Sequence, residues 1–273
     1  MRNRIIILGP KGMLGQMVSL YFSRCGFDVI EFQRRFTDES FLAYIQELNN
    51  LGDGIVVNCI GRIKQKSEDA HELVWSNSIL PLALARSLKS SHVLIQPSTD
   101  CVFDGQTKYS YNSRDMHTAK DLYGWSKSLG ETAILARPNS LVIRVSIIGP
   151  DKNSNKGLLA WFLGNSSRAK LNGYTNHYWN GITTLEWCKI LHDLIANENL
   201  FIKYFDLGLV QIGTEQVFSK FDMLSLFADI FDKDLQINAT ASDYTYRCLK
   251  PDILAKPLRL QLTELKQFYF SEK

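Results

Sequence analysis

The stretch that decides the fold lies near the start of the chain, where residues 4–15 read RIIILGPKGMLG. Its first five residues are a short apolar run rich in β-branched side chains, as expected of a strand buried on both faces of a parallel sheet. A glycine-bearing turn follows at once, and from Met13 to Arg24 the apolar residues recur at helical spacing. Residues 27–30, FDVI, form a second strand-like run. These segments predict one βαβ unit.

The same alternation continues as far as Pro150. Helix-like patterns at 41–48, 73–88 and 121–136 are interleaved with strand-like runs at 54–58, 92–96 and 140–145. Strands that alternate with helices, without hairpin signals between them, predict a doubly wound parallel sheet of the Rossmann type with right-handed crossovers. We therefore expect an α/β fold in which residues 1–150 form the main domain.

The character of the sequence changes after Pro150, because the residues that follow are polar and turn-rich. Later helix-like patterns lie at 184–195, 219–231 and 258–270, and a strand-like run lies at 204–210. We expect the chain to return to the sheet at about 181–212, and residues 151–180 and 213–273 to form a smaller C-terminal lobe. The last pattern predicts a docking helix.

Composition excludes several classes of function. The 273 residues, 45% of them hydrophobic, can bury a large core, and the formal charge of +3 includes no basic run that could follow a nucleic-acid backbone. No apolar stretch reaches the roughly 18–20 residues that span a bilayer, so we expect a cytoplasmic protein without membrane partners. The five cysteines form no Cys-x-x-Cys pair and the histidines show no metal-ligand spacing, so we expect reduced thiols and no metal.

The glycine turn suggests a ligand. Gly9, Gly12 and Gly15 form the pattern G-x-x-G-x-x-G between the first strand and the first helix. A backbone without Cβ can turn sharply and approach a pyrophosphate, whose charge the helix N-terminus then stabilises. The pattern therefore predicts dinucleotide binding. The alternative is that these glycines only shape a tight turn.

The end of the second strand bears on which dinucleotide binds. There the chain reads Phe32-Gln33-Arg34-Arg35-Phe36, where an Asp or Glu would hold the ribose 2′-hydroxyl of NAD. Two arginines suit a 2′-phosphate, so we expect NADP, with NAD as the alternative. Arg34 and Arg35 could instead belong to a solvated loop, and Glu31 is an alternative ribose ligand if the strand ends earlier.

A tyrosine and a lysine mark the chemistry. Tyr123 and Lys127 are four residues apart on an expected helix, so both lie on one face. Reduction of a carbonyl needs a proton as well as a hydride, and a neighbouring ammonium lowers the pKa of a tyrosine, about 10 when unperturbed. Thr99, chosen over Ser98, follows the fourth strand at the carboxyl edge and could fix the carbonyl oxygen. An isolated Tyr-x-x-x-Lys is common by chance, but here it follows the S-T-D segment at 98–100.

Together, the segments 9–15, 58–61, 98–105 and 123–127 resemble the extended short-chain dehydrogenase/reductases, and among them the dTDP-4-dehydrorhamnose reductases. The resemblance covers about the first 150 residues. It implies that Thr99, Tyr123 and Lys127 are catalytic and that Lys127 also binds the nicotinamide ribose. The expected cofactor contacts are Gly9, Lys11, Gly12, Met13, Leu14, Gly15, Gln33, Arg34, Arg35, Cys59, Ile60, Gly61, Tyr123 and Lys127.

In such reductases the C-terminal lobe holds a nucleotide diphosphate sugar, but this chain lacks a clear D-Q-x-x-x-P-T pattern there and instead carries aromatic and amide side chains at 172–184. These could stack on a base and bind a sugar, or they could merely pack the lobe on the sheet. Lys152, Lys156 and Arg168 could neutralise a diphosphate or be ordinary surface cations. The expected substrate contacts are Cys101, Val102, Asn176, Trp179 and Arg247, the last in a segment that resembles the family's late substrate-closing segment.

The resemblance implies an NADPH-dependent oxidoreductase that reduces a keto group, at C4, of a nucleotide-linked deoxy-sugar for deoxy-sugar or surface-polysaccharide synthesis. A nucleotide-sugar epimerase or dehydratase of the same family would use the same Tyr123 and Lys127 but recycle its cofactor. A non-catalytic NADP-binding regulatory subunit, like the partner of a methionine adenosyltransferase in this family, is the third alternative. A homodimer is the expected assembly.

Overall fold

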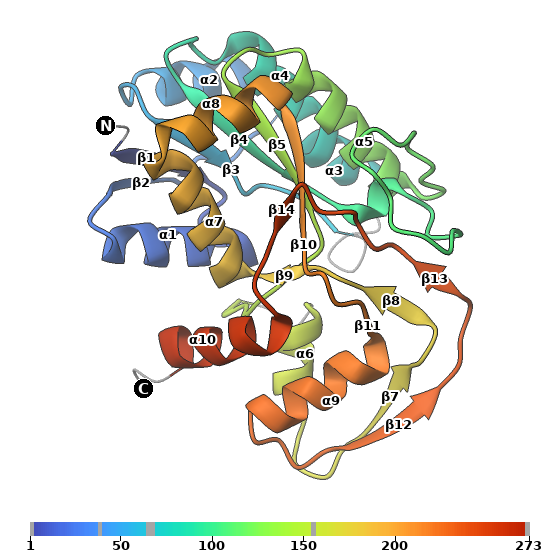
Figure 1. Cartoon of the computed structure of the whole chain (residues 1–273). Coiled ribbons are helices and arrows are strands. Elements are labelled where there is room, and N and C mark those ends of the chain that lie inside the picture. The colour runs from blue at the N-terminus through green and yellow to red at the C-terminus, as the bar shows by residue number, and fades with distance from the viewer. Residues whose placement is uncertain (1–2, 38–39, 64–68, 154–156, 271–273) are drawn as a thin grey trace.

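A seven-stranded sheet, in which all neighbouring strands run parallel, forms the larger part of the molecule (Figure 1). The structure, a computed structural model, describes residues 3–37, 40–63, 69–153 and 157–270. In spatial order the strands are β14 (Ile253–Leu254), β10 (Leu209–Gly213), β5 (Ser140–Val145), β4 (Val93–Ser98), β3 (Ile55–Asn58), β1 (Arg4–Leu8) and β2 (Asp28–Phe32). The expected doubly wound parallel sheet is confirmed.

The strands are apolar on both faces because helices cover both. Along β1, Ile5 and Ile7 pack into one core, and Ile6 and Leu8 into another. Figure 1 shows the helices on the two sides of the sheet. The first core is covered by α1 (Met13–Arg24) and α7 (Thr184–Ala196), and the second by α2 (Phe41–Asn49), α4 (Leu80–Ser87) and α5 (Leu122–Leu135). Strand period and two-sided burial together explain the unbroken apolar runs.

Two expected elements differ in the structure. The helix expected at 73–88 is three pieces, α3 (Ala70–Val74), the π-helical turn η2 (Trp75–Ile79) and α4. The strand expected at 204–210 begins instead as a helix, α8 (Glu198–Leu207), which Asn197 caps and which ends at Gly208 with φ 71°. Only after that left-handed glycine does the chain become extended in β10. None of the helices in the described ranges is long and apolar enough to span a membrane.

A smaller group of elements lies beyond the carboxyl ends of the strands (Figure 1). It contains a three-stranded sheet of β11 (Phe218–Ser219), β8 (His177–Trp179) and β13 (Thr245–Tyr246), and a pair of β12 (Gln236–Thr240) and β7 (Lys170–Tyr174). The helices here are α6 (Leu158–Leu163), α9 (Lys220–Ile230) and α10 (Leu258–Phe270), and β6 (Ile147–Ile148) pairs with β9 (Ile182–Thr183). One part of the expected C-terminal lobe belongs elsewhere, because β14 pairs with β10 at the edge of the large sheet.

Candidate active site

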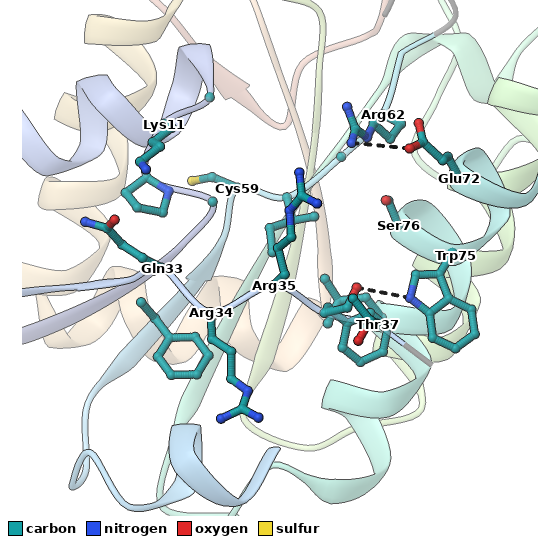
Figure 2. A pocket seen from close by; sticks show the side chains of 18 of the residues that line it. Lys11, Gln33, Arg34, Arg35, Thr37, Cys59, Arg62, Glu72, Trp75 and Ser76 are labelled. Carbon is teal, nitrogen blue, oxygen red and sulfur yellow. Dashed lines mark hydrogen bonds and ion pairs between the residues drawn. The ribbon is translucent and has the colours of Figure 1, made fainter. Parts of the chain in front are cut away.

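A cavity of about 650 Å³ opens at the carboxyl ends of β1, β2 and β3, the place where the strand order reverses around β1 (Figure 2). It is lined by residues 9–12, 32–37 and 59–62 and by His71, Glu72, Trp75, Ser76 and Leu80. Nine of the expected cofactor contacts line it, namely Gly9, Lys11, Gly12, Gln33, Arg34, Arg35, Cys59, Ile60 and Gly61. Met13, Leu14 and Gly15 lie behind it on α1, and Tyr123 and Lys127 lie on α5 outside this lining.

The three glycines of the first turn have different structural roles. A Cβ on Gly15 would lie 2.2 Å from the Gly9 carbonyl oxygen, and Gly9 itself has φ 70° and packs against Ile60. Both are therefore needed for the turn itself. Gly12 is different, because the nearest protein atom to a Cβ there would be 3.5 Å away, and it is the N-cap of α1 without a side-chain cap. The open N-terminus of α1 at Gly12 suits an anion.

The two arginines after β2 point in opposite directions (Figure 2). Arg35 reaches toward Cys59 and Arg62, whereas Arg34 turns away and forms an ion pair with Glu47 of α2. Glu31 accepts a hydrogen bond from the Ser19 hydroxyl at 2.5 Å and is not part of the cavity lining. The cavity therefore presents Arg35 rather than Glu31 to a bound ribose.

An aromatic stack forms the wall opposite Lys11. The Trp75 ring stacks on Phe36 with centroids 5.2 Å apart and on His71 at 5.6 Å, and the Trp75 indole donates to the Phe36 carbonyl. Trp75 is the first residue of η2, and π-helical turns are frequent at functional sites.

The same turn buries a polar side chain that sequence analysis missed. Asn77 accepts a hydrogen bond from the Arg62 N–H at 2.9 Å and donates to the Arg62 carbonyl at 2.9 Å and the Ser126 hydroxyl at 3.0 Å. It thus ties the loop after β3 to α5, between Tyr123 and Lys127. The available signal was the polar group of Asn77 and the serines on either side of it, which interrupts the apolar pattern of 73–88.

The expected catalytic side chains converge from two elements. Thr99 directly follows β4, and its hydroxyl caps the short helix η3 (Asp100–Val102), accepting from the Cys101 N–H at 3.1 Å. Lys127, only 9% exposed, donates to the Pro97 carbonyl at 2.8 Å. Burial lowers the pKa of Lys127 to about 8, although nearby Glu131 raises it.

The pKa of Tyr123 is raised, whereas the sequence predicted that a neighbouring ammonium would lower it. Burial of the phenol raises its pKa, as does nearby Cys101, whereas the hydrogen bond with Thr99 lowers it. The Lys127 ammonium donates one hydrogen bond to the Pro97 carbonyl. Tyr123 is therefore a protonated phenol near neutral pH, the form that can donate a proton.

Glycines hold α5 against these segments. A Cβ on Gly124 would lie 2.2 Å from the Cys101 carbonyl oxygen, and one on Gly130 would lie 2.2 Å from the Asn77 carbonyl oxygen. The glycine of the Tyr-Gly-x-x-Lys pattern is thus required by packing, since it lets Tyr123 approach the turn that carries Thr99.

A buried ion pair lies one turn beyond Lys127. Glu131 and Arg144, each 1% exposed, form a two-pronged pair with N···O distances of 3.1 and 2.7 Å. Arg144 also donates to the Gln211 side chain at 2.8 Å, and the His117 ring lies 3.2 Å from the Glu131 carboxylate. Burial would raise the pKa of Glu131, but hydrogen bonds from His117 and Arg144 lower it to about 2. The carboxylate is therefore ionised, and sequence analysis did not find it.

The structure brings only some of the expected substrate contacts near the segment that carries Thr99. Arg247 lies beside Cys101, with Nη1 3.9 Å from the sulfur, and donates to the Phe103 carbonyl at 3.1 Å. Trp179 donates to the Ser146 hydroxyl at 2.8 Å. The prediction for Val102 is wrong for its side chain, which is fully buried in a cluster with Phe103, Tyr111 and Leu249.

Asn176 and the loop cations lie apart from that group. Asn176 is half-buried and hydrogen-bonds both the N–H and the carbonyl of Ser242. Arg168 pairs with Asp234 at 3.6 Å on the surface, and Lys152 lies over the Tyr269 ring. Lys156 lies outside the described residues.

Comparison with known proteins finds related sequences over about half of the chain. Over 152 residues the chain is 30% identical to a dTDP-4-dehydrorhamnose reductase of Mycobacterium tuberculosis, covering 53% of this chain and 50% of that protein. A protein of Streptomyces antibioticus described as a probable dTDP-4,6-dihydroxy-2-methyloxan-3-one 4-ketoreductase is 29% identical over 149 residues, covering 52% of this chain and 50% of that protein. The chain thus spans about half the length of the curated relatives it matches.

Solved structures share the fold over nearly the whole chain. A dTDP-4-dehydrorhamnose reductase of Bacillus anthracis in complex with NADP has a TM-score of 0.83 at 17% identity, with 98% of this chain and 99% of that one covered. A UDP-glucose 4-epimerase of Thermotoga maritima has a TM-score of 0.75 at 15% identity, with 97% and 98% covered. The model of the family described as RmlD substrate binding domain matches residues 2–172, more than half of the chain, and the protein therefore belongs to that family.

Proposed function

We propose that the protein is an NADPH-dependent reductase of the C4 keto group of a nucleotide-linked deoxy-sugar. The observation that carries the proposal is the convergence of Thr99, Tyr123 and Lys127 at the carboxyl edge of the sheet that also holds the dinucleotide-sized cavity. The names of the two relatives, a dTDP-4-dehydrorhamnose reductase at 30% identity and a probable 4-ketoreductase of a dTDP-linked compound at 29%, support it.

The cavity fits a dinucleotide. The open N-terminus of α1 at Gly12 would hold the pyrophosphate, and Arg35 would hold the 2′-phosphate of NADPH. The aromatic wall of Phe36 and Trp75 offers a flat apolar surface for a base. When bound, NADPH supplies a hydride to the substrate carbon.

Three side chains of the protein then bind and protonate the carbonyl oxygen of the substrate. The Thr99 hydroxyl, which donates to the Asp100 carboxylate at 3.1 Å, would turn its proton to the carbonyl oxygen of the substrate. Tyr123, held protonated by burial, donates its proton as that oxygen becomes an alkoxide. Lys127, anchored at the Pro97 carbonyl, directs its other N–H groups to the ribose and to the tyrosinate that remains. We assign residues 151–180 and 213–270, apart from β14, to the substrate lobe, which faces this edge.

The test is the loss of NADPH absorbance when purified protein meets freshly prepared dTDP-, UDP- and GDP-linked 4-keto sugars. Consumption with one of them supports the reductase and names its nucleotide. Conversion of a sugar without net NADPH consumption would indicate an epimerase or dehydratase. NADPH binding without any conversion would favour the regulatory subunit.

The opposite directions of the two arginines predict that Arg35, rather than Arg34, determines the preference for NADPH over NADH. Replacing Arg35 by Ala should lower kcat/KM with NADPH roughly tenfold or more, because a charge-assisted hydrogen bond to the 2′-phosphate is lost, and should leave kcat/KM with NADH nearly unchanged. The matched Arg34→Ala variant should have the smaller effect, since Glu47 already holds that guanidinium. A larger loss from Arg34→Ala would contradict this assignment.

Two further assignments are part of the proposal. A second copy of the chain would cover the exposed Trp125 and Leu129 on the outer face of α5, giving a homodimer that the molar mass in solution can check. We place the protein in the cytoplasm, where NADPH is regenerated and where thiols such as those of the five cysteines stay reduced. Cell fractionation checks this.

A further inference from the structure

The small three-stranded sheet brings two cations to one face. In the order β11-β8-β13, Ser219 and Tyr246 both pair with Tyr178. Adjacent residues along a strand point to opposite faces, so the next residues, Lys220 and Arg247, share the face of Trp179. The Lys220 ammonium lies 5.8 Å from the centre of the Trp179 ring, in agreement with this placement.

That face is turned toward the segment that carries Thr99. Trp179 hydrogen-bonds Ser146, just beyond β5, and Arg247 hydrogen-bonds the Phe103 carbonyl and lies beside Cys101. Asp100, which lies near both cations, is 8% exposed, and its carboxylate accepts a hydrogen bond from the Thr99 hydroxyl at 3.1 Å. Burial raises the pKa of Asp100, and the positive charges of Arg247 and Lys220 oppose that rise.

The charges at this face do not balance. Asp100 is the carboxylate that acts on Lys220, and in the described part of the chain neither Lys220 nor Arg247 has a carboxylate within 4 Å. The other nearby acids have partners of their own. Asp121 caps α5 by accepting from the Gly124 N–H, and Asp222 accepts from Ser219 in the capping box of α9. Two cations therefore oppose one buried carboxylate.

Lys220 and Arg247 are both half-buried, and an excess of positive charge in a partly buried site is unfavourable unless an anion binds there. We propose that Lys220 and Arg247 together bind the diphosphate of the nucleotide-linked substrate, with Asp100 holding the two cations in place between substrate turnovers. This inference rests on the proposed function. It adds Lys220, which sequence analysis did not single out, to the substrate-binding residues. A lysine supplies a point charge and an arginine a planar fork, a combination suited to a two-phosphate group.

The experiment measures binding without turnover. The full chain, saturated with NADPH, is titrated calorimetrically with dTDP, UDP and GDP, and with the phosphate-free nucleoside of whichever diphosphate binds best. In Lys220→Met the affinity for that diphosphate should fall roughly tenfold or more, while nucleoside and NADPH binding stay unchanged. Lys220→Arg should restore most of the loss. Lys170→Met, an exposed lysine on β7 of the same lobe, is the matched control and should bind as the wild type does.

The outcomes separate this proposal from the proposed function. Unchanged diphosphate affinity in a folded Lys220→Met variant would overturn it and make the two cations mere counter-charges of Asp100. Failure of all three diphosphates to bind the wild type at millimolar concentration would overturn it as well. Diphosphate binding that depends on Lys220, in a protein that reduces none of the keto sugars, would support it while the reductase fails. If Lys220→Met does not fold, Lys220→Gln and Arg247→Gln provide the same comparison.

Discussion

Replacing Tyr123 by Phe is expected to lower the turnover of the keto sugar by about 10²–10⁴-fold, the usual contribution of a positioned proton donor. The phenol is the group that burial keeps protonated beside Thr99, and Ser126, three residues along α5, already donates its hydroxyl proton to the Tyr123 carbonyl at 2.8 Å. NADPH binding should be unchanged, because Tyr123 is not part of the cavity lining. NADPH consumption and NADPH fluorescence measure the two quantities.

Tyr109→Phe is the matched control, since that tyrosine is 65% exposed and should keep wild-type turnover. Near-normal turnover in Tyr123→Phe would refute the role of Tyr123 as proton donor. A parallel loss of NADPH binding would instead show that the change disturbs the packing of α5.

The second large effect concerns stability. Replacing Glu131 by Gln should lower the free energy of unfolding by about 3–5 kcal/mol at pH 7, because it leaves the buried charge of Arg144 without its carboxylate. Urea unfolding measures the difference. Glu215→Gln, an exposed position, should change stability by no more than about 0.5 kcal/mol.

The pH dependence of that difference has a definite sign. The pKa of Glu131 is lowered to about 2 in the folded protein, and that of an unfolded glutamate is about 4.3. The contribution of the carboxylate is therefore fully present above about pH 4.3 and is lost as the pH falls toward 2. The gap between wild type and Glu131→Gln should shrink over that range.

A double variant separates charge from packing. Replacing Glu131 by Gln and Arg144 by Met together removes both buried charges, and should recover much of the stability lost in the single variant. A double variant as unstable as Glu131→Gln alone would mean that the side-chain shapes, rather than the unpaired charge, cause the loss.

Much of the fold could be predicted because its signals are local. The apolar run at β1 and the glycines after it specify a strand, a turn and a helix within residues 4–24, and each later pair of elements repeats that pattern. Burial on both faces removes the strand alternation, and this in turn indicates a parallel sheet. Thr99, Tyr123 and Lys127 could be placed at one edge because parallel strands present all their carboxyl ends there.

Other features depend on contacts that no local pattern encodes. The apolar spacing of 73–88 predicts one continuous helix and does not indicate the π-helical turn, which is stabilised by the hydrogen bonds of Asn77 to Arg62 and Ser126. The short strands of the smaller lobe pair with partners far along the chain, as β7 does with β12. Along β7 exposed and buried residues alternate, but one of its two buried positions is Gly173, so the sequence shows no strong apolar period there.

The sequence alone determined the order of elements, the glycine turn, and the residue types from which a reductase site could be built, because apolar period and turn chemistry act between near neighbours. The tertiary structure decided which charges act together. It turned Arg34 to Glu47 and Arg35 into the cavity, paired Glu131 with Arg144, and set Lys220 and Arg247 against Asp100. The free energy of a charge depends on its distance to other charges and on its burial, and both are known only once the chain is folded.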